Sequence, residues 1–249
     1  MTIARAIAAL PVVLMSGLLG TTGARAQDST TVGLGVAAVP TYQGSGEYRV
    51  LPFPLLNINI GPFFAGMVDG VGMHVIDTPS FKIGGSVTYV RGYRHRDVPE
   101  GKDNLSDAAG ARLFTTLRMA GFTATLGATR SIGGTKGTVA DLRISYPMMV
   151  SPKLVVIPTV TTSWASDKHM NRYFGITQRE ANVSGLGQFS TSSGFKDVNA
   201  GITTNYRLAD GLNLTANVGM SYLFDRAADS PLVQHRLRPM GFAGVSYSF

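Results

Sequence analysis

Strict alternation of apolar and polar side chains, repeated in many short segments, is the feature that most restricts the fold of this chain. In 212–222 every second residue is apolar or aromatic, and the residues between them are polar or small. Successive side chains of a β-strand point to opposite faces, so such a segment has one apolar face and one polar face. The same pattern recurs in 81–89, 111–118, 122–129 and 140–146. The sequence therefore predicts an all-β protein.

Aromatic residues distinguish a membrane barrel from a soluble β-sandwich, whose strands also alternate. Aromatic side chains end several strands on the apolar face, where a barrel carries its interfacial girdle: Tyr89, Tyr146, Tyr206, Tyr222, Tyr247 and Phe249. The alternating segment 241–249 ends on Phe249, an exposed apolar edge that a soluble protein would avoid. With Tyr247, it resembles the C-terminal signal that the barrel-assembly machinery reads. We therefore expect a transmembrane antiparallel β-barrel surrounded by outer-membrane lipid.

The pattern predicts about 12 strands, an even number that keeps both ends of a closed antiparallel barrel in the periplasm. The predicted strands are 31–39, 47–60, 62–68, 71–76, 81–91, 110–118, 121–131, 137–147, 153–163, 195–207, 212–223 and 239–249. The third and fourth are short for a full membrane span, so ten strands is an alternative.

The lengths of the connections support this arrangement. The joints assigned to the periplasm are short: 61, 77–80, 119–120, 148–152 and 208–211. Three long loops, 92–109, 164–194 and 224–238, fall on the opposite side. Short periplasmic turns and long extracellular loops are typical of outer-membrane barrels.

The first residues have the features of a secretory signal peptide. Arg5 precedes an apolar stretch over 6–20, and Ala24-Arg25-Ala26 fits the small-x-small rule for cleavage. The stretch is short for a membrane helix and contains Pro11. We expect a signal peptide over 1–26, a barrel domain over 27–249, and export to the outer membrane.

Charge and cysteine content exclude several classes of function. Without Arg5 and Arg25, 20 Lys and Arg face 15 Asp and Glu, a net charge of +5. The positive charge is scattered and no nucleic-acid motif is present, so no nucleic-acid partner is expected. The chain contains no cysteine, which excludes disulfides and thiolate metal sites. We expect no cofactor.

One long loop contains the phrase YFGITQREANVSGL, over 173–186. Thr177 and Glu180 fit a capping box, and Ser184-Gly185 would end the helical turn, which predicts a short helix. Tyr173 and Phe174 are large apolar side chains that a loop in water has no reason to expose. We expect the loop to fold over or into the barrel mouth, either as a rigid lid or as a recognition surface.

Asp229-Ser230-Pro231 lies in the last long loop. These residues are typical of a turn, with Asp225 and Arg226 close by for pairing. We interpret the segment as a structural turn, and a recognition site is the alternative.

Charged residues also fall on the inward faces of the strands. They are Lys82, Arg112, Arg118, Asp141, Arg143 and Arg207. An excess of positive charge would favour small anions if water could pass, but paired lumen charges also fill the interior of a closed barrel. The charges leave both possibilities open.

The histidines give little support to an enzyme. None of them lies at metal-ligand spacing or in a recognised catalytic triad motif. Some barrel enzymes place a His with an acid or Ser on the outer rim, which leaves His95 with Asp97, His169 with Asp167, and His235 as candidates. Lone loop histidines are more often solvated, so we expect no catalytic or metal site and no enzyme activity.

Five ordered stretches of the chain look like the signatures of one protein family. They are PTYQGSGEYRVLPFP over 40–54, YFGIT with SGL over 173–186, FKDV over 195–198, AADSPLV over 227–233, and the terminal YSF. The stretches span the mature chain and resemble the MipA/OmpV outer-membrane family. His169 stands where that family has a tyrosine, so the chain departs from the family pattern at this position.

The resemblance implies a barrel whose best-described member is a scaffold between a lytic transglycosylase and a penicillin-binding protein. We therefore expect a non-catalytic scaffold in cell-wall assembly, with these two enzymes as partners. The alternatives are a small anion-preferring channel and a surface adhesin or antigen. One tension remains: murein enzymes are periplasmic, whereas the signature loops lie on the outer side.

Overall fold

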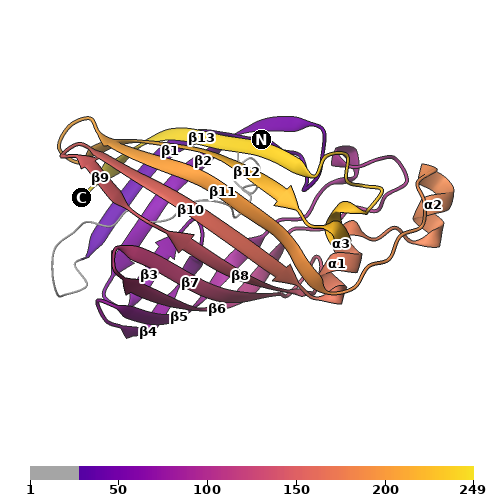
Figure 1. Ribbon diagram of the computed structural model, residues 1–249, viewed down its shortest axis with the longest axis horizontal. Helices are drawn as coiled ribbons and strands as arrows, with labels where there is room; N and C mark the ends of the chain where they lie inside the picture. The colour runs from indigo at the N-terminus through magenta and orange to yellow at the C-terminus, as the bar shows by residue number, and fades with distance from the viewer. Residues whose placement is uncertain (1–27) are drawn as a thin grey trace, which may run out of the picture.

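The computed structural model describes residues 28–249, which form a closed antiparallel β-barrel with loops and short helices at one end (Figure 1). The strands are β1 (Ser29–Pro40), β2 (Tyr48–Ile60), β3 (Phe63–Gly66), β4 (Gly70–Asp77), β5 (Phe81–Val90), β6 (Ala108–Met119), β7 (Phe122–Ser131), β8 (Thr138–Ser145), β9 (Met148–Ser151), β10 (Leu154–Ala165), β11 (Gly194–Arg207), β12 (Leu212–Leu223) and β13 (Leu237–Ser248). The loops contain η1 (His95–Asp97), α1 (Asp167–Phe174), α2 (Gln178–Ser184) and α3 (Asp225–Ala228). The predicted signal peptide, 1–26, lies outside the described residues.

Antiparallel pairing between neighbours, with β13 pairing back onto β1, closes the ring. Both β8 and β9 pair with β10, so these two segments are one strand interrupted at Tyr146 and Pro147. Proline donates no hydrogen bond to a ladder, and Pro158 of β10 lies beside the break, where its carbonyl accepts from the Tyr146 amide at 3.1 Å. The 13 segments thus form a barrel of 12 strands. The predicted strand count is confirmed, and the alternative of ten is wrong.

The alternating sequence produces an apolar outer face and a polar interior. In β12, Val218 is 69% exposed, whereas the neighbouring Asn217 and nearby Thr215 are 3% and 1% exposed. Asn217 donates to the Thr203 hydroxyl of β11 at 2.9 Å, so its buried amide is satisfied within the wall. Apolar side chains left outside would be costly in water and are favourable in lipid. Within residues 28–249, no helix has both the length and the apolar character to cross a bilayer.

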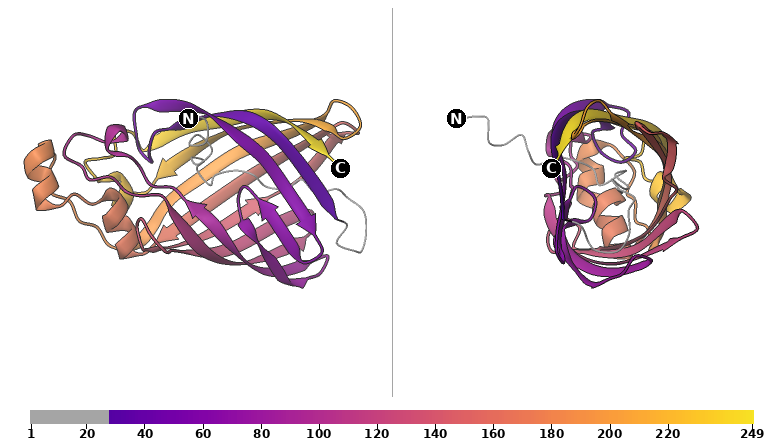
Figure 2. Two further views of the ribbon diagram at one scale, coloured as in Figure 1. Left: turned by 180° about the vertical axis from the view of Figure 1, so that it is seen from behind. Right: turned by 90° about the vertical axis from the view of Figure 1, so that its left-hand side faces the viewer.

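The two ends of the barrel differ in the lengths of their connections. Short turns lie at the end that holds the C-terminus, and the long loops with α1, α2 and α3 lie at the other end (Figure 1). Seen along the barrel axis, the strands form a ring and loop helices lie across its far opening (Figure 2). The predicted asymmetry is correct. The predicted joint 148–152 differs, because most of it is β9 and the turn itself is at Pro152 and Lys153.

One part of the wall is incomplete. The sequence pattern predicts a third strand over 62–68, but β3 stops at Gly66 and the chain turns back through 67–69 into β4. As a result β2 pairs with β3 only over 57–60, although β1 covers β2 along its whole length. The remaining edge of β2, over 48–56, has no strand partner among the described residues.

Candidate functional site

The extracellular cap consists of the three long loops, 91–107, 166–193 and 224–236, together with the turn 41–47. These segments share a hydrophobic core with the upper ends of the strands. Its buried members are Tyr42, Tyr93, Val98, Leu105, Ala165, Met170, Tyr173, Phe174, Ile176, Ala181, Leu223, Ala227, Ala228 and Leu232. A core of this kind holds the loops in one arrangement over the barrel.

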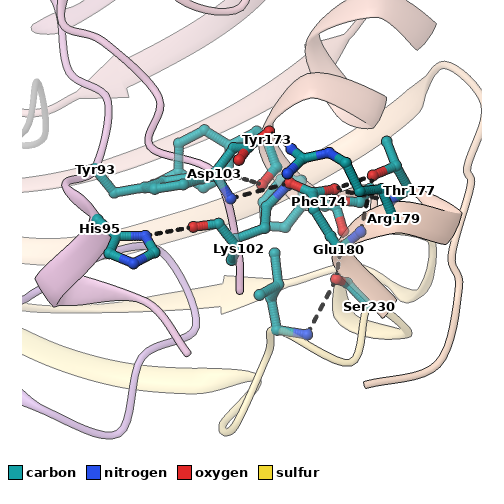
Figure 3. Close-up of polar contacts among 12 residues, drawn as sticks. Tyr93, His95, Lys102, Asp103, Tyr173, Phe174, Thr177, Arg179, Glu180 and Ser230 are labelled. Carbon is teal, nitrogen blue, oxygen red and sulfur yellow. Dashed lines mark hydrogen bonds and ion pairs between the residues drawn. The ribbon is translucent and has the colours of Figure 1, made fainter. Parts of the chain in front are cut away.

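The end of α1 is the point at which the loops meet. Three successive carbonyls, of residues 173–175, each accept a hydrogen bond from a different side chain (Figure 3). The Tyr93 hydroxyl donates to the first at 3.0 Å, the Ser230 hydroxyl to the second at 2.5 Å, and the Lys102 ammonium to the third at 2.9 Å. The last carbonyls of a helix lack partners within the helix. The other two loops supply those partners and are thereby fixed to α1.

Glu180 connects α2 to the same junction. One carboxylate oxygen accepts from the amide and hydroxyl of Thr177, both at 2.8 Å, and the other from Lys102 at 2.9 Å and the Asp103 amide at 3.1 Å. The capping box predicted at Thr177 and Glu180 is confirmed. Burial alone would raise the pKa of the Glu180 carboxyl, but these hydrogen bonds together outweigh it and lower the pKa to about 2. The carboxylate is therefore charged at neutral pH.

Two neutral rings form the underside of the cap. His169 stacks on Tyr173 with ring centroids 5.9 Å apart, and its Nδ1 lies 3.2 Å from the Thr135 hydroxyl oxygen. Burial, together with the charge of Lys196, lowers the pKa of His169 to about 3. Burial likewise raises the pKa of the Tyr173 hydroxyl to about 12, so neither ring carries charge at neutral pH.

The three residues of the predicted turn separate into different environments. Ser230 is 2% exposed and holds the Phe174 carbonyl, whereas Asp229 is exposed and pairs with Arg236 at 2.8 Å. Pro231 is exposed next to buried Leu232. Only Ser230 of the three therefore joins the junction at α1.

Below the cap, an ion-pair layer lies inside the barrel, between β6, β8 and the β3–β4 turn. Arg112 donates to Asp69 at 3.1 Å and to both oxygens of Asp141 at 2.6 and 3.0 Å. Arg143 donates to the same Asp69 at 2.9 Å. Two inward arginines of the wall thus share an aspartate from the β3–β4 turn, and Gly127 leaves room for the Arg112 guanidinium.

The ion-pair layer lies between two cavities. The upper chamber, of about 240 Å³, has the underside of the cap as its roof, and the lower cavity is about 210 Å³. Val68 and Arg143 line both of them. Paired charges with satisfied hydrogen bonds are one way in which the interior of a barrel is filled.

The other predicted lumen charges do not join this layer. Lys82 and Arg118 line the lower cavity, where Lys82 pairs with Asp77 at 2.8 Å. Arg207 is exposed at the end of β11, on the side of the short turns. Of the six predicted residues, the structure brings together Arg112, Asp141 and Arg143.

The candidate catalytic residues His95 and Asp97 have separate partners, and His169 lies against Thr135. Nδ1 of His95 lies 2.9 Å from the carbonyl oxygen of Lys102, and Asp97 instead pairs with Arg49 at 3.4 Å. Among residues 28–249, no group of three His, Cys, Asp or Glu side chains could hold a metal ion.

At the C-terminus, Tyr247 and Phe249 lie on the outer face of the last strand. Their ring centroids are 5.0 Å apart, and Phe249 is 80% exposed. The Phe249 amide donates to the Thr30 carbonyl at 2.9 Å, which continues the pairing that closes the barrel. The role of these rings in assembly stays a prediction.

Sequence reasoning missed Asp69, Tyr93 and Lys102. Asp69 falls in a predicted tight turn, and nothing in its local sequence indicates that the turn enters the lumen. Lys102 lies in a loop without alternation, 78 residues from its partner Glu180. A signal was present only at Glu180, where the capping box indicated an ordered loop.

The comparison with protein families decides which family this barrel represents. A family model described as "MltA-interacting protein MipA" matches residues 32–249. The chain belongs to the MipA family. The resemblance found in the five signatures is confirmed.

Two named relatives agree with membership of the MipA family and with an outer-membrane location. The "24 kDa outer membrane protein" of Pasteurella multocida is 23% identical over 219 residues, which cover 83% of this chain and 85% of that protein. The "MltA-interacting protein" of Escherichia coli is 21% identical over 234 residues, covering 91% and 92%. This MipA family barrel is thus an outer-membrane protein.

Solved outer-membrane barrels resemble this MipA family chain only distantly. The channel DcaP of Acinetobacter baumannii has a TM-score of 0.39 at 9% identity, covering 93% of this chain and 100% of that one. The toluene transporter TodX of Pseudomonas putida has a TM-score of 0.37 at 12% identity, covering 90% of each. Scores at this level give no basis for transferring the function of a channel.

Proposed function

We propose that this protein is a non-catalytic scaffold of the outer membrane that holds a lytic transglycosylase and a penicillin-binding protein together. The observation that carries the proposal is the alignment with a protein named for interaction with MltA, which extends over 91% of this chain. A scaffold acts through its surface and requires neither a catalytic group nor an open lumen. The ion-pair layer and the packed cap are consistent with a barrel that acts through its surface.

The periplasmic rim is the surface we assign to these partners. Murein enzymes work in the periplasm, so they meet the short turns and not the cap. The turns are 61–62, 78–80, 120–121, 152–153 and 208–211. Lys153 and Arg207 lie at neighbouring positions of this rim, since the Arg207 amide donates to the Lys153 carbonyl at 2.8 Å. We infer that these two cations contribute to recognition of an acidic patch on a partner.

The cap then has a structural role. Tyr173 and Phe174 are 7% and 1% exposed and are packed in the cap core, which leaves little of either ring for a partner. We assign them, with Ser230, to a rigid lid that stabilises the barrel mouth. Asp229 and Pro231 belong to the turn that brings Ser230 under α1.

The experiment is a binding measurement with the protein reconstituted in lipid nanodiscs and immobilised. Purified lytic transglycosylase and penicillin-binding protein from the same bacterium are passed over it, and an unrelated outer-membrane barrel serves as the reference surface. The proposal expects specific retention of both enzymes and weaker retention by the double variant Lys153→Glu, Arg207→Glu. Lys168→Glu with Arg179→Glu, which reverses two exposed charges of the cap, is the matched control and should retain both. Retention no greater than on the reference barrel would contradict the scaffold.

A further inference from the structure

Arg238 is a buried arginine without an anionic partner. It is 9% exposed and lines the upper chamber. One guanidinium nitrogen donates to the Gly46 carbonyl at 2.9 Å, and the guanidinium lies 4.4 Å from the centre of the Tyr48 ring. Its Nε has no hydrogen-bond partner, and no ion pair joins it to a carboxylate in the described part of the chain. A buried cation is costly unless an anion neutralises it, so this site is incomplete on its own.

The charges that line the upper chamber also favour an anionic ligand. Six Arg and Lys side chains line it, and four of them have an aspartate partner, Arg236 pairing with Asp229. Arg112, Arg143 and Lys196 have aspartate partners in the ion-pair layer or in Asp197. Arg91, like Arg238, donates to a backbone carbonyl, that of Thr41 at 2.6 Å. Positive charge between low-dielectric walls attracts an anionic group.

The gap in the wall lies beside this chamber, whose lining includes Val68 and residues 88–91. The Phe249 amide donates to the Thr30 carbonyl, so the backbone N–H and C=O groups of even-numbered residues in β1 point toward β13 and away from β2. Leu34 of β1 lies opposite Pro54 of β2. The backbone groups of even-numbered residues in β2 therefore point away from β1, toward the gap. Two of the residues on this free edge are Pro52 and Pro54, which have no N–H to leave unpaired in lipid. The sequence thus reduces the polarity of an open edge.

The interior beside the gap is apolar. A cluster from β1, β2, β13 and the β3–β4 turn faces inward there: Ala37, Val39, Leu51, Phe53, Leu55, Met67, Met240 and Phe242. Val39 and Met240 also line the upper chamber. The chamber is further lined by Val90, which points inward from β5, and by its neighbour Tyr89. The pairing of β5 with β4 ends at Val87, so among the described residues this end of β5 has no strand partner on the side of β2.

We propose that the upper chamber binds a single-chain amphiphile with an anionic head, which enters from the membrane between β2 and β5. The head, a carboxylate or a phosphate, pairs with Arg238 and Arg91. The chain lies along the apolar cluster at Val39 and Met240. The proposal is independent of the scaffold function, because it uses the chamber and not the periplasmic rim.

Equilibrium dialysis of radiolabelled dodecanoate against the protein in phosphatidylcholine nanodiscs tests the proposal, with empty nanodiscs as the blank. We expect saturable binding, unaffected by acetate and displaced by dodecyl phosphate more effectively than by dodecanol. Arg238→Met should weaken binding by about tenfold or more, because a buried charged pair loses one partner. Arg130→Met, at an exposed arginine outside the chamber, is the matched control and should bind normally. Absence of saturable binding, or equal displacement by dodecanol, would overturn the proposal.

A second measurement uses the unaltered protein, so its result does not depend on whether the variants fold. A dodecanoate analogue with a terminal diazirine is photo-crosslinked in the same nanodiscs, and the adducts are mapped by mass spectrometry. Adducts that excess dodecanoate suppresses are expected on Val39, Val68 and Met240, which line the chamber. Suppressible adducts confined to outward residues such as Leu34 and Val218 would overturn the proposed site.

Discussion

Lys102 Nζ lies 2.9 Å from a carboxylate oxygen of Glu180, and the two side chains are 6% and 3% exposed. The pair joins two loops that are 78 residues apart in sequence. The Lys102 ammonium also donates to the Gly175 carbonyl at the end of α1. This one side chain therefore links two of the three long loops.

Lys102→Met should loosen the cap, because it leaves the Glu180 carboxylate buried without its cation. Removing one partner of a buried ion pair costs about 3–5 kcal/mol. We expect rapid proteolysis within 166–193 in the variant, measured by limited digestion in detergent, while the barrel itself remains resistant. Arg179→Met is the control, since its pair with Asp103 is exposed and worth about 1 kcal/mol or less. Equal protease resistance of Lys102→Met and the unaltered protein would contradict the role of the pair.

Gly137→Ala should displace α1 from the barrel rim. A Cβ at this position would lie 2.5 Å from the backbone nitrogen of His169, and a backbone atom cannot move away without shifting the helix. We expect a lower thermal unfolding temperature, read from the heat-dependent change in gel mobility typical of barrels. In the same cap, Gly187→Ala meets nothing within 4 Å and should leave that temperature unchanged. The explanation fails if the two variants behave alike.

The stability of the cap should fall in mild acid because of His169. Its pKa is about 3 in the folded protein, against the ordinary histidine value of 6.5 in the unfolded chain, so the unfolded state takes up the proton first. The stability that the neutral ring contributes is complete above pH 6.5 and is lost as pH falls toward 3, by about 1.4 kcal/mol per pH unit. Unfolding temperatures between pH 7 and 5 should therefore depend less on pH in His169→Phe. An unchanged dependence in that variant would assign the effect to other groups.

Arg112→Met should open the ion-pair layer. The substitution leaves the Asp141 carboxylate without the arginine that binds both of its oxygens, and it makes the layer less compact. We expect a lower unfolding temperature and the appearance of small conductance steps in planar bilayers. Lys82→Met, which breaks a pair in the lower cavity and leaves the layer intact, should produce neither change. If Arg112→Met has a lower unfolding temperature but produces no conductance steps, this layer alone does not seal the lumen.

Much of the barrel could be predicted because lipid on one side and a polar lumen on the other impose alternation along each strand. The prediction failed where local chemistry interrupts a strand: Pro147 divides β8 from β9, and β3 stops at Gly66 because the chain turns into the lumen. Asp69 could not be identified from the sequence, since its partners Arg112 and Arg143 lie 43 and 74 residues away.

The cap could be predicted only in part. Tyr173 and Phe174 indicated a loop with a buried side, and the capping box fixed the start of α2. Tyr93 and Lys102 donate to the carbonyls at the end of α1, but they lie in a loop with no periodic pattern. Such contacts between loops depend on the closure of the barrel, which brings distant segments to one rim.

Single-channel recording of the unaltered protein in planar lipid bilayers tests most directly whether the barrel is a sealed scaffold and not a channel. With the cap and the ion-pair layer in place, we predict no resolved conductance steps at neutral pH in either chloride or acetate solutions. Regular steps with anion selectivity in the unaltered protein would contradict the sealed barrel and would favour the anion-preferring channel.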